Sequence, residues 1–211
     1  MSTFFSSDWE AGTGILDSVW TGDTDAHSIL SVSADQFFTG AHSLKCIQAN
    51  YTAYLYKTFA AIATIGLRFA VRIHTAPVYY TILGELGGGP MSYIRLYPTT
   101  FYVDNGTGSA IGTPFTFALD TWYQIELLYT NGNTTLAWRV WNAGGSKILA
   151  GPYSGTPHNP ATIGEIYVGP VVDPDTATFW LDSLVADNAA YPGPIVTATS
   201  FYPMPSFKPG Y

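Results

Sequence analysis

The stretch 121–142, with the sequence TWYQIELLYTNGNTTLAWRVWN, constrains the fold of this chain more than any other. Its two halves alternate apolar and polar residues with a period of two, as half-buried β-strands require. Asn131-Gly132 between them is a typical tight hairpin turn. Folding at this turn gathers large apolar side chains on one face: Tyr123, Ile125, Leu127, Tyr129, Leu136, Trp138 and Val140. We therefore predict a central antiparallel hairpin in a two-layer β protein.

Two registers of this hairpin are compatible with the pattern. In the first register Ile125 lies opposite Trp138. In the second, the turn shifts by one residue at each end, which keeps the faces but places Glu126 opposite Arg139. Cross-strand neighbours of opposite charge attract, so we expect Glu126 to form a surface ion pair on the outward face.

The rest of the chain reads as short strands separated by Gly, Pro and Asn turns. The expected strands are 4–10, 28–33, 36–48, 52–59, 65–74, 79–86, 92–97, 100–104, 115–119, 163–168 and 178–186. The sequence contains no convincing amphipathic helical period with caps. These features predict an all-β fold, an antiparallel jelly-roll β-sandwich, formed by residues 1–190.

The composition changes after Asn188, where prolines alternate with aromatic residues. Prolines favour an extended, polyproline-like course, so we predict an extended C-terminal arm over residues 191–211. Its aromatic residues need a surface to cover them, either on their own sandwich or on a neighbouring subunit. The residues that would dock are Tyr191, Phe201, Tyr202, Phe207 and Tyr211.

Charge excludes several classes of partner. The chain has 15 acidic and 8 basic residues and a net charge of −7, whereas phosphate binding needs clustered Lys and Arg. We therefore expect no nucleic-acid partner and no anionic membrane partner. The most apolar run, 59–73, is interrupted by Arg68 and Arg72 and predicts no membrane span. Cys46 is the single cysteine, which excludes an intrachain disulfide and favours a buried thiol.

Three stretches resemble strands of the concanavalin A-like lectin/glucanase jelly rolls, in their laminin-G-like branch. They are GAHSLK at 40–45, WYQIEL at 122–127 and FWLDSLV at 179–185. The resemblance covers residues 1–195 and implies the concanavalin A-like fold. Such domains without a signal peptide, which the N-terminus here lacks, are similar to those of tailed-phage capsid-surface and tail proteins.

The resemblance therefore implies a non-enzymatic virion structural protein, made in the host cytoplasm and displayed on a phage capsid or tail. Its lectin-like domain would face outward and bind host or environmental glycans. Copies of itself and other virion proteins would be its partners through the C-terminal arm. The alternatives are a free-standing, extracellular carbohydrate-binding module or adhesin, and a divergent polysaccharide-cleaving enzyme.

The glutamates argue against glycoside hydrolysis. Some relatives of this fold are glycosidases whose catalytic strand carries Glu-x-Asp-x-x-Glu, and the reaction needs two carboxylates at a defined separation. Glu10, Glu85, Glu126 and Glu165 are each isolated in the sequence. A lyase-type site would gather His, Tyr, Arg and Gln on one face, an arrangement that the sequence leaves open.

Aromatic residues are the candidates for glycan binding, because a ring stacks on the C–H face of a pyranose while polar groups address its hydroxyls. We nominate Trp122, Trp141, Tyr79, Tyr80 and Tyr97. The resemblance also implies a structural calcium where an N-terminal acid meets the closing strand. Asp8 and Asp182 are the corresponding residues, and carboxylate oxygens are ligands that calcium prefers.

Overall fold

The computed structural model describes residues 3–10, 19–49, 51–77, 81–86, 92–130, 135–157, 162–170 and 176–196. Their secondary structure is all β. The strands are β1 (Thr3–Ser7), β2 (Gly22–Asp23), β3 (Leu30–Ser33), β4 (Ser43–Ala49), β5 (Leu55–Ile62), β6 (Thr64–Thr75), β7 (Thr81–Leu86), β8 (Ser92–Leu96), β9 (Thr100–Asp104), β10 (Phe115–Thr116), β11 (Trp122–Thr130), β12 (Thr135–Asn142), β13 (Ile148–Gly155), β14 (Ile163–Val168) and β15 (Thr176–Asp187). In these ranges the chain has no helix that could cross a membrane.

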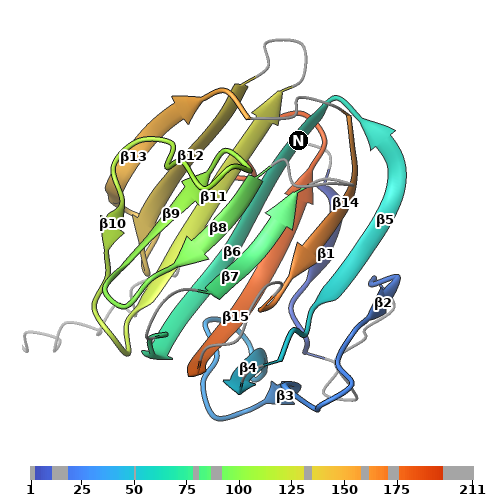
Figure 1. The fold of residues 1–211 in the computed structure, drawn as a ribbon, viewed down its shortest axis with the longest axis vertical. Coiled ribbons are helices and arrows are strands. Elements are labelled where there is room, and N and C mark those ends of the chain that lie inside the picture. The colour runs from blue at the N-terminus through green and yellow to red at the C-terminus, as the bar shows by residue number, and fades with distance from the viewer. Residues whose placement is uncertain are drawn as a thin grey trace, which may run out of the picture.

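The strands form two antiparallel sheets stacked face to face (Figure 1). The eight-stranded sheet has the order β13-β12-β11-β6-β15-β4-β3, with β1 paired to β15. The seven-stranded sheet has the order β10-β9-β8-β7-β14-β5-β2. In both sheets hairpins of consecutive strands alternate with neighbours far apart in sequence, such as β6 with β15 and β5 with β14. The molecule is therefore the jelly-roll β-sandwich that the sequence predicts.

The core fills the space between the sheets. Alternate residues of β6, β11 and β12 point inward and meet those of β8, β9 and β14. Trp138 of β12 lies 6.5 Å from Phe101 of β9, and Tyr123 of β11 lies 5.2 Å from Phe115 of β10, between ring centroids. Cys46 is buried in this core, as expected. These ring contacts join the two sheets and fix their relative position.

The central hairpin adopts the second of the two predicted registers. Glu126 lies opposite Arg139, and Ile125 lies opposite Val140. The first register, with Ile125 opposite Trp138, is wrong, and the turn 131–134 lies outside the described residues. The expected ion pair forms, with 2.6 Å between Arg139 Nε and Glu126 Oε2. It is not a surface pair, however, because the Glu126 side chain is fully buried.

A segment that we call the C-terminal strap, residues 188–196, lies on the outer face of the eight-stranded sheet. Arg68 Nη1 donates to the Gly193 carbonyl at 2.6 Å. The Gln124 side-chain amide donates to the Ile195 carbonyl at 2.8 Å and accepts the Ile195 N–H at 2.7 Å. A Cβ at Gly66 would lie 1.7 Å from the Ala190 carbonyl oxygen, so the strap needs a glycine beneath it.

The strap explains the burial of the ion pair. Its Tyr191 ring lies 4.1 Å from the Arg139 guanidinium, which in turn contacts Glu126. The start of the predicted arm thus packs on its own sandwich. The remaining docking residues, Phe201, Tyr202, Phe207 and Tyr211, lie outside the described residues, and docking on a neighbouring subunit stays a prediction.

Candidate functional site

The outer face of the seven-stranded sheet carries a band of tyrosines. Leu55, Ile94, Val103 and Ile166 of this sheet are buried in the core. Because side chains alternate along a strand, the residues between them point outward. We call the following set the tyrosine face: Tyr54, Tyr56, Tyr93, Arg95, Tyr97, Tyr102, Asp104, Glu165 and Tyr167.

Strand register lines up part of this set in a row across the sheet. Asp104 of β9 lies opposite Tyr93 of β8. Tyr93 lies opposite Glu85 of β7, and Glu85 lies opposite Tyr167 of β14. Tyr167 in turn lies opposite Tyr56 of β5. Tyrosines and acidic residues thus follow one another over five strands.

Three tyrosine rings cluster at the β5–β14 end of the row. Tyr54 and Tyr167 meet edge to face, with 5.1 Å between centroids and 86° between planes. Tyr56 lies 6.5 Å from Tyr167. The Tyr167 hydroxyl donates to the Glu165 carboxylate on the same strand. Each ring is half-buried, so part of its surface is open to a ligand.

The β8–β9 end of the row combines rings with charges. Arg95 forms an ion pair with the fully buried Asp104, and its guanidinium lies 5.3 Å from the Tyr93 ring. The Tyr102 hydroxyl donates to the Tyr97 hydroxyl at 3.1 Å, and the two rings are stacked. Burial, together with this hydrogen bond, raises the pKa of Tyr102 well above its usual value. The phenol therefore stays neutral at physiological pH.

Such a surface suits a flat ligand that alternates C–H and hydroxyl groups. The half-exposed rings of Tyr54, Tyr56 and Tyr167 can accept the C–H groups, while the tyrosine hydroxyls and the Glu165 carboxylate beside them can pair with the hydroxyls. Of the nominated aromatic residues, Tyr97 lies on this face, and Tyr79 and Tyr80 fall outside the described residues. The signal that the sequence offered for the rest is the outward alternation of Tyr54 and Tyr56.

The two nominated tryptophans lie on the other sheet and pack against protein. The Trp122 ring is 5.6 Å from the Phe38 ring in the loop before β4. Trp141 Nε1 donates to Glu126 Oε2 at 2.6 Å. The structure thus separates Trp122 and Trp141 from Tyr97 by the thickness of the sandwich.

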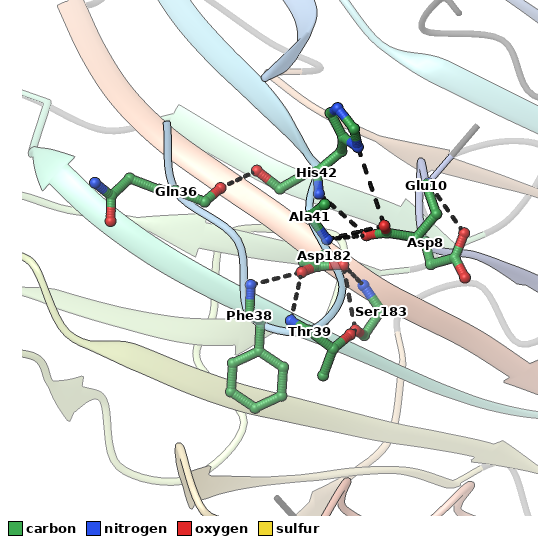
Figure 2. Close-up of polar contacts among 10 residues, drawn as sticks. Asp8, Glu10, Gln36, Phe38, Thr39, Ala41, His42, Asp182 and Ser183 are labelled. Carbon is green, nitrogen blue, oxygen red and sulfur yellow. Dashed lines mark hydrogen bonds and ion pairs between the residues drawn. The ribbon is translucent and has the colours of Figure 1, made fainter. Parts of the chain in front are cut away.

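The residues nominated for calcium do not fit that ion. Figure 2 shows the Asp182 carboxylate facing amide donors of the loop before β4. Oδ2 accepts the N–H groups of Phe38 and Thr39, at 2.6 and 3.0 Å, and Oδ1 accepts both the N–H and the hydroxyl of Ser183. Asp8 Oδ1 accepts the Glu10 N–H at 3.2 Å.

Donors that surround a carboxylate occupy the positions a cation would need, whereas calcium takes six to eight oxygen ligands. Within the ranges that the structure describes, no three His, Cys, Asp or Glu side chains gather as a metal site. Asp182 instead anchors a loop, and Glu10 assists by accepting the N–H groups of Ala41 and His42 (Figure 2).

We predict a pH-dependent stability term at Asp182. Burial raises its pKa to about 6, against the opposing effect of the amide donors. The folded protein therefore binds this proton more tightly than the unfolded chain, whose value is near 3.8. The stabilisation that this protonated carboxyl gives the folded protein is complete below about pH 4. It is lost as the pH rises through about 6.

The variant Asp182→Asn removes this titration but keeps an oxygen acceptor for the loop amides. Urea unfolding at pH 4, 5, 6 and 7 measures the effect. The free energy of unfolding of the original protein should fall, relative to that of the variant, by about 2 kcal/mol over this range. A constant difference between the two proteins at all four pH values would contradict the prediction.

Comparison with known proteins shows the fold. No protein-family model matches the chain, and no curated protein matches its sequence. Among solved structures, the cellulose-induced protein Cip1 superimposes with a TM-score of 0.61 at 15% identity, over 87% of this chain and 97% of Cip1.

A GH131 β-glucanase catalytic domain from Podospora anserina gives a TM-score of 0.60 at 11% identity, over 85% of this chain and 86% of that domain. A sialidase gives 0.59 at 11% identity, over 89% of this chain but only 18% of the sialidase. The chain therefore shares a jelly-roll β-sandwich fold with these proteins, which is consistent with the fold that the resemblance implied.

Proposed function

We propose that this protein binds carbohydrate through its tyrosine face. The observation that carries the proposal is the row of tyrosines and carboxylates over five strands, from Asp104 to Tyr56. Half-buried rings held against one another form a rigid platform, so little conformational entropy is lost when a ligand binds. Glu165 and Arg95 beside the rings supply partners for sugar hydroxyls.

The opposite sheet supports this assignment because protein covers its outer face. The C-terminal strap and the loop before β4 lie there, and Gln124 and Glu126 beneath the strap have no exposed surface. Trp180 on the same face is only 6% exposed. The protein's own chain therefore occupies part of the outer face of the eight-stranded sheet.

The comparisons support a glycan ligand because some proteins with this fold act on glycans. The β-glucanase and the sialidase act on glycans, as their names state. At 11% identity they share the fold with this chain, and the fold alone does not imply their activities. The ligand class is proposed here from the face itself.

We further propose that the face binds without cleaving. Glycoside hydrolysis needs one free carboxylic acid and one free carboxylate. Glu165 accepts the Tyr167 hydroxyl, and Asp104 pairs with Arg95 and also accepts the Gly106 N–H at 2.6 Å. The Glu165 and Asp104 carboxylates are thus engaged by the protein. Display of the domain on a phage particle is part of the proposal that rests on the resemblance alone.

The proposal is tested by the double variant Tyr56→Ala, Tyr167→Ala. A glycan array first selects the ligand, and calorimetry then measures its affinity. Removing two stacking rings should weaken binding at least about tenfold, because aromatic anchors typically cost about 2 kcal/mol when truncated. Incubation of the original protein with the same glycan should release no reducing ends.

Trp122→Ala is the matched control, since it removes a half-buried ring from the opposite sheet and should leave affinity unchanged. Loss of binding in this control, with full binding by the double variant, would overturn the proposal and favour the tryptophans nominated from the sequence. Failure of every glycan on the array would also overturn it.

A further inference from the structure

A separate hollow lies on the other side of the molecule. A pocket of about 240 Å³ sits on the outer side of the eight-stranded sheet, where β1, β15 and the C-terminal strap meet. The tyrosine face belongs to the other sheet and shares no residue with it. The lining residues that matter below are Ser6, Asp8, Thr39, Arg68, Ser183 and Ile195.

An irregularity of β15 produces this hollow. The register between β15 and β6 shifts between Asp182 and Val185, so the two strands lose their regular pairing there. Ser183 in this gap has a φ of 50°, in the left-handed region that non-glycine residues rarely adopt. Strained backbone of this kind is commonly found at binding sites, where the surroundings hold it in place.

The walls of the pocket are fixed before any ligand arrives. The Thr39 N–H donates to Asp182 (Figure 2). The Thr39 and Ser183 hydroxyls are 2.7 Å apart. On the opposite wall Ile195 makes two hydrogen bonds with the side chain of Gln124. A preformed pocket loses little entropy on binding.

Arg68 provides a donor that the protein leaves unused. Its Nη1 donates to the Gly193 carbonyl, but its Nε is buried and has no acceptor among the described residues. A buried N–H without a partner costs free energy, and such groups in native proteins usually serve water or a ligand. Arg68 lines the pocket, and its guanidinium gives this wall its positive charge.

Asp8 supplies a negatively charged hydrogen-bond acceptor. It is exposed at the pocket, and one of its carboxylate oxygens accepts the Glu10 N–H. Ser6, also exposed, adds a hydroxyl at the same strand edge. One cation and one anion balance each other, so the pocket has no net charge to attract an ion.

A mixture of donors and acceptors beside an apolar wall suits ligands whose every hydroxyl both donates and accepts. The volume is below the roughly 300–1,000 Å³ typical of sites for drug-sized ligands, which leaves room for one ring rather than a chain. We infer that this pocket binds a single neutral sugar ring, with Arg68 and Asp8 addressing its hydroxyls and Ile195 covering its C–H face. The inference does not depend on the tyrosine face.

Nuclear magnetic resonance titration of the full-length protein tests this site. The probes are methyl β-glucoside, methyl β-galactoside, methyl α-mannoside and N-acetylglucosamine, with glucuronate as the anionic comparison. At least one neutral probe should shift the amide signals of residues 6–8, 39, 183 and 195. These signals report the pocket separately from the tyrosine face.

Asp8→Asn distinguishes a neutral ligand from an anion. It removes a carboxylate that would accept hydrogen bonds from a neutral sugar and would repel an anion. We expect neutral-sugar binding to weaken roughly tenfold, the usual effect of losing a charged hydrogen bond. Arg68→Lys, which keeps the charge but loses the planar guanidinium, should weaken binding similarly. Arg72→Lys on the same strand, outside the pocket, is the matched control and should bind normally.

Arg68 also holds the strap, so Arg68→Lys could lose binding because the strap is loosened. Ser6→Phe tests the pocket without touching that contact. Ser6 is exposed, so the substitution should leave the fold intact while filling the pocket and abolishing the shifts. Shifts confined to the tyrosine face, binding of glucuronate that tightens in Asp8→Asn, or no shift with any probe would each overturn the inference. The first of these outcomes would leave the proposed function standing.

Discussion

Trp138→Ala is expected to destabilise the protein by about 3–5 kcal/mol, the cost of truncating a large core aromatic residue. Trp138 has no exposed surface, and its ring contacts Phe101 of the facing sheet and Tyr153 of the neighbouring strand. Its Nε1 donates to the Ile111 carbonyl at 2.5 Å. The variant would therefore leave both a cavity and a buried carbonyl without its donor.

Urea unfolding measures this effect as a lower midpoint with an unchanged slope. Trp122→Ala is the control, because this tryptophan is half-buried on the outer face of the sheet, where its ring contacts Phe38. Trp122→Ala should lower the free energy of unfolding by less than about 1.5 kcal/mol, a value between those typical of surface and of core substitutions. Equal destabilisation by the two variants would contradict the placement of the two rings.

The second large effect is expected at Glu126. Glu126→Ala removes the partner of Arg139 Nε and of Trp141 Nε1, both of which donate to Glu126 Oε2 at 2.6 Å. Breaking a buried ion pair from one side leaves the other charge without a partner, which typically costs about 3–5 kcal/mol. We expect the lower part of this range, because the Arg139 side chain remains 20% exposed and solvent can reach it.

Asp35→Ala is the matched control for this prediction. Asp35 pairs with Lys45 at 2.7 Å, but its side chain is 63% exposed, so the pair is screened by water. Thermal unfolding should show little change for Asp35→Ala and a clear loss for Glu126→Ala. If removing Glu126 were as harmless as removing Asp35, the strap could not be covering the ion pair.

The sequence predicts the central strands well because burial imposes a strict period of two. The strands 100–104 and 163–168 begin and end where expected, and β6 extends the predicted 65–74 by one residue at each end. Each lies inside a sheet, where one face is fully buried. Alternation is therefore a strong signal at these positions.

Edge strands escape the same reasoning. β13, Ile148–Gly155, was not expected, because Gly151 and Pro152 interrupt its pattern. Proline is tolerated at the edge of a sheet, where its missing N–H breaks no ladder, and β13 is the edge strand of the eight-stranded sheet. β2, with two residues, is too short to show any period.

The site was harder to predict than the fold, because it depends on which strands become neighbours. The outward position of Tyr56 follows from alternation, but its approach to Tyr167 requires that β5 and β14 pair across more than a hundred residues of sequence. Trp122 and Trp141 were assigned to the correct outward face. The strap and loop that engage this face make contacts that no local pattern reveals.

The strap and the tyrosine face lie on opposite sides of the sandwich. The described chain ends at Val196 on the outer side of the eight-stranded sheet, whereas the tyrosine face is on the far side of the sandwich. Coupling to a solid support through a single point at the exposed Val196 would therefore orient every copy alike, with its tyrosines turned toward the solution. Random coupling through lysines should give a mixture of orientations, and an immobilised glycan would then find fewer sites.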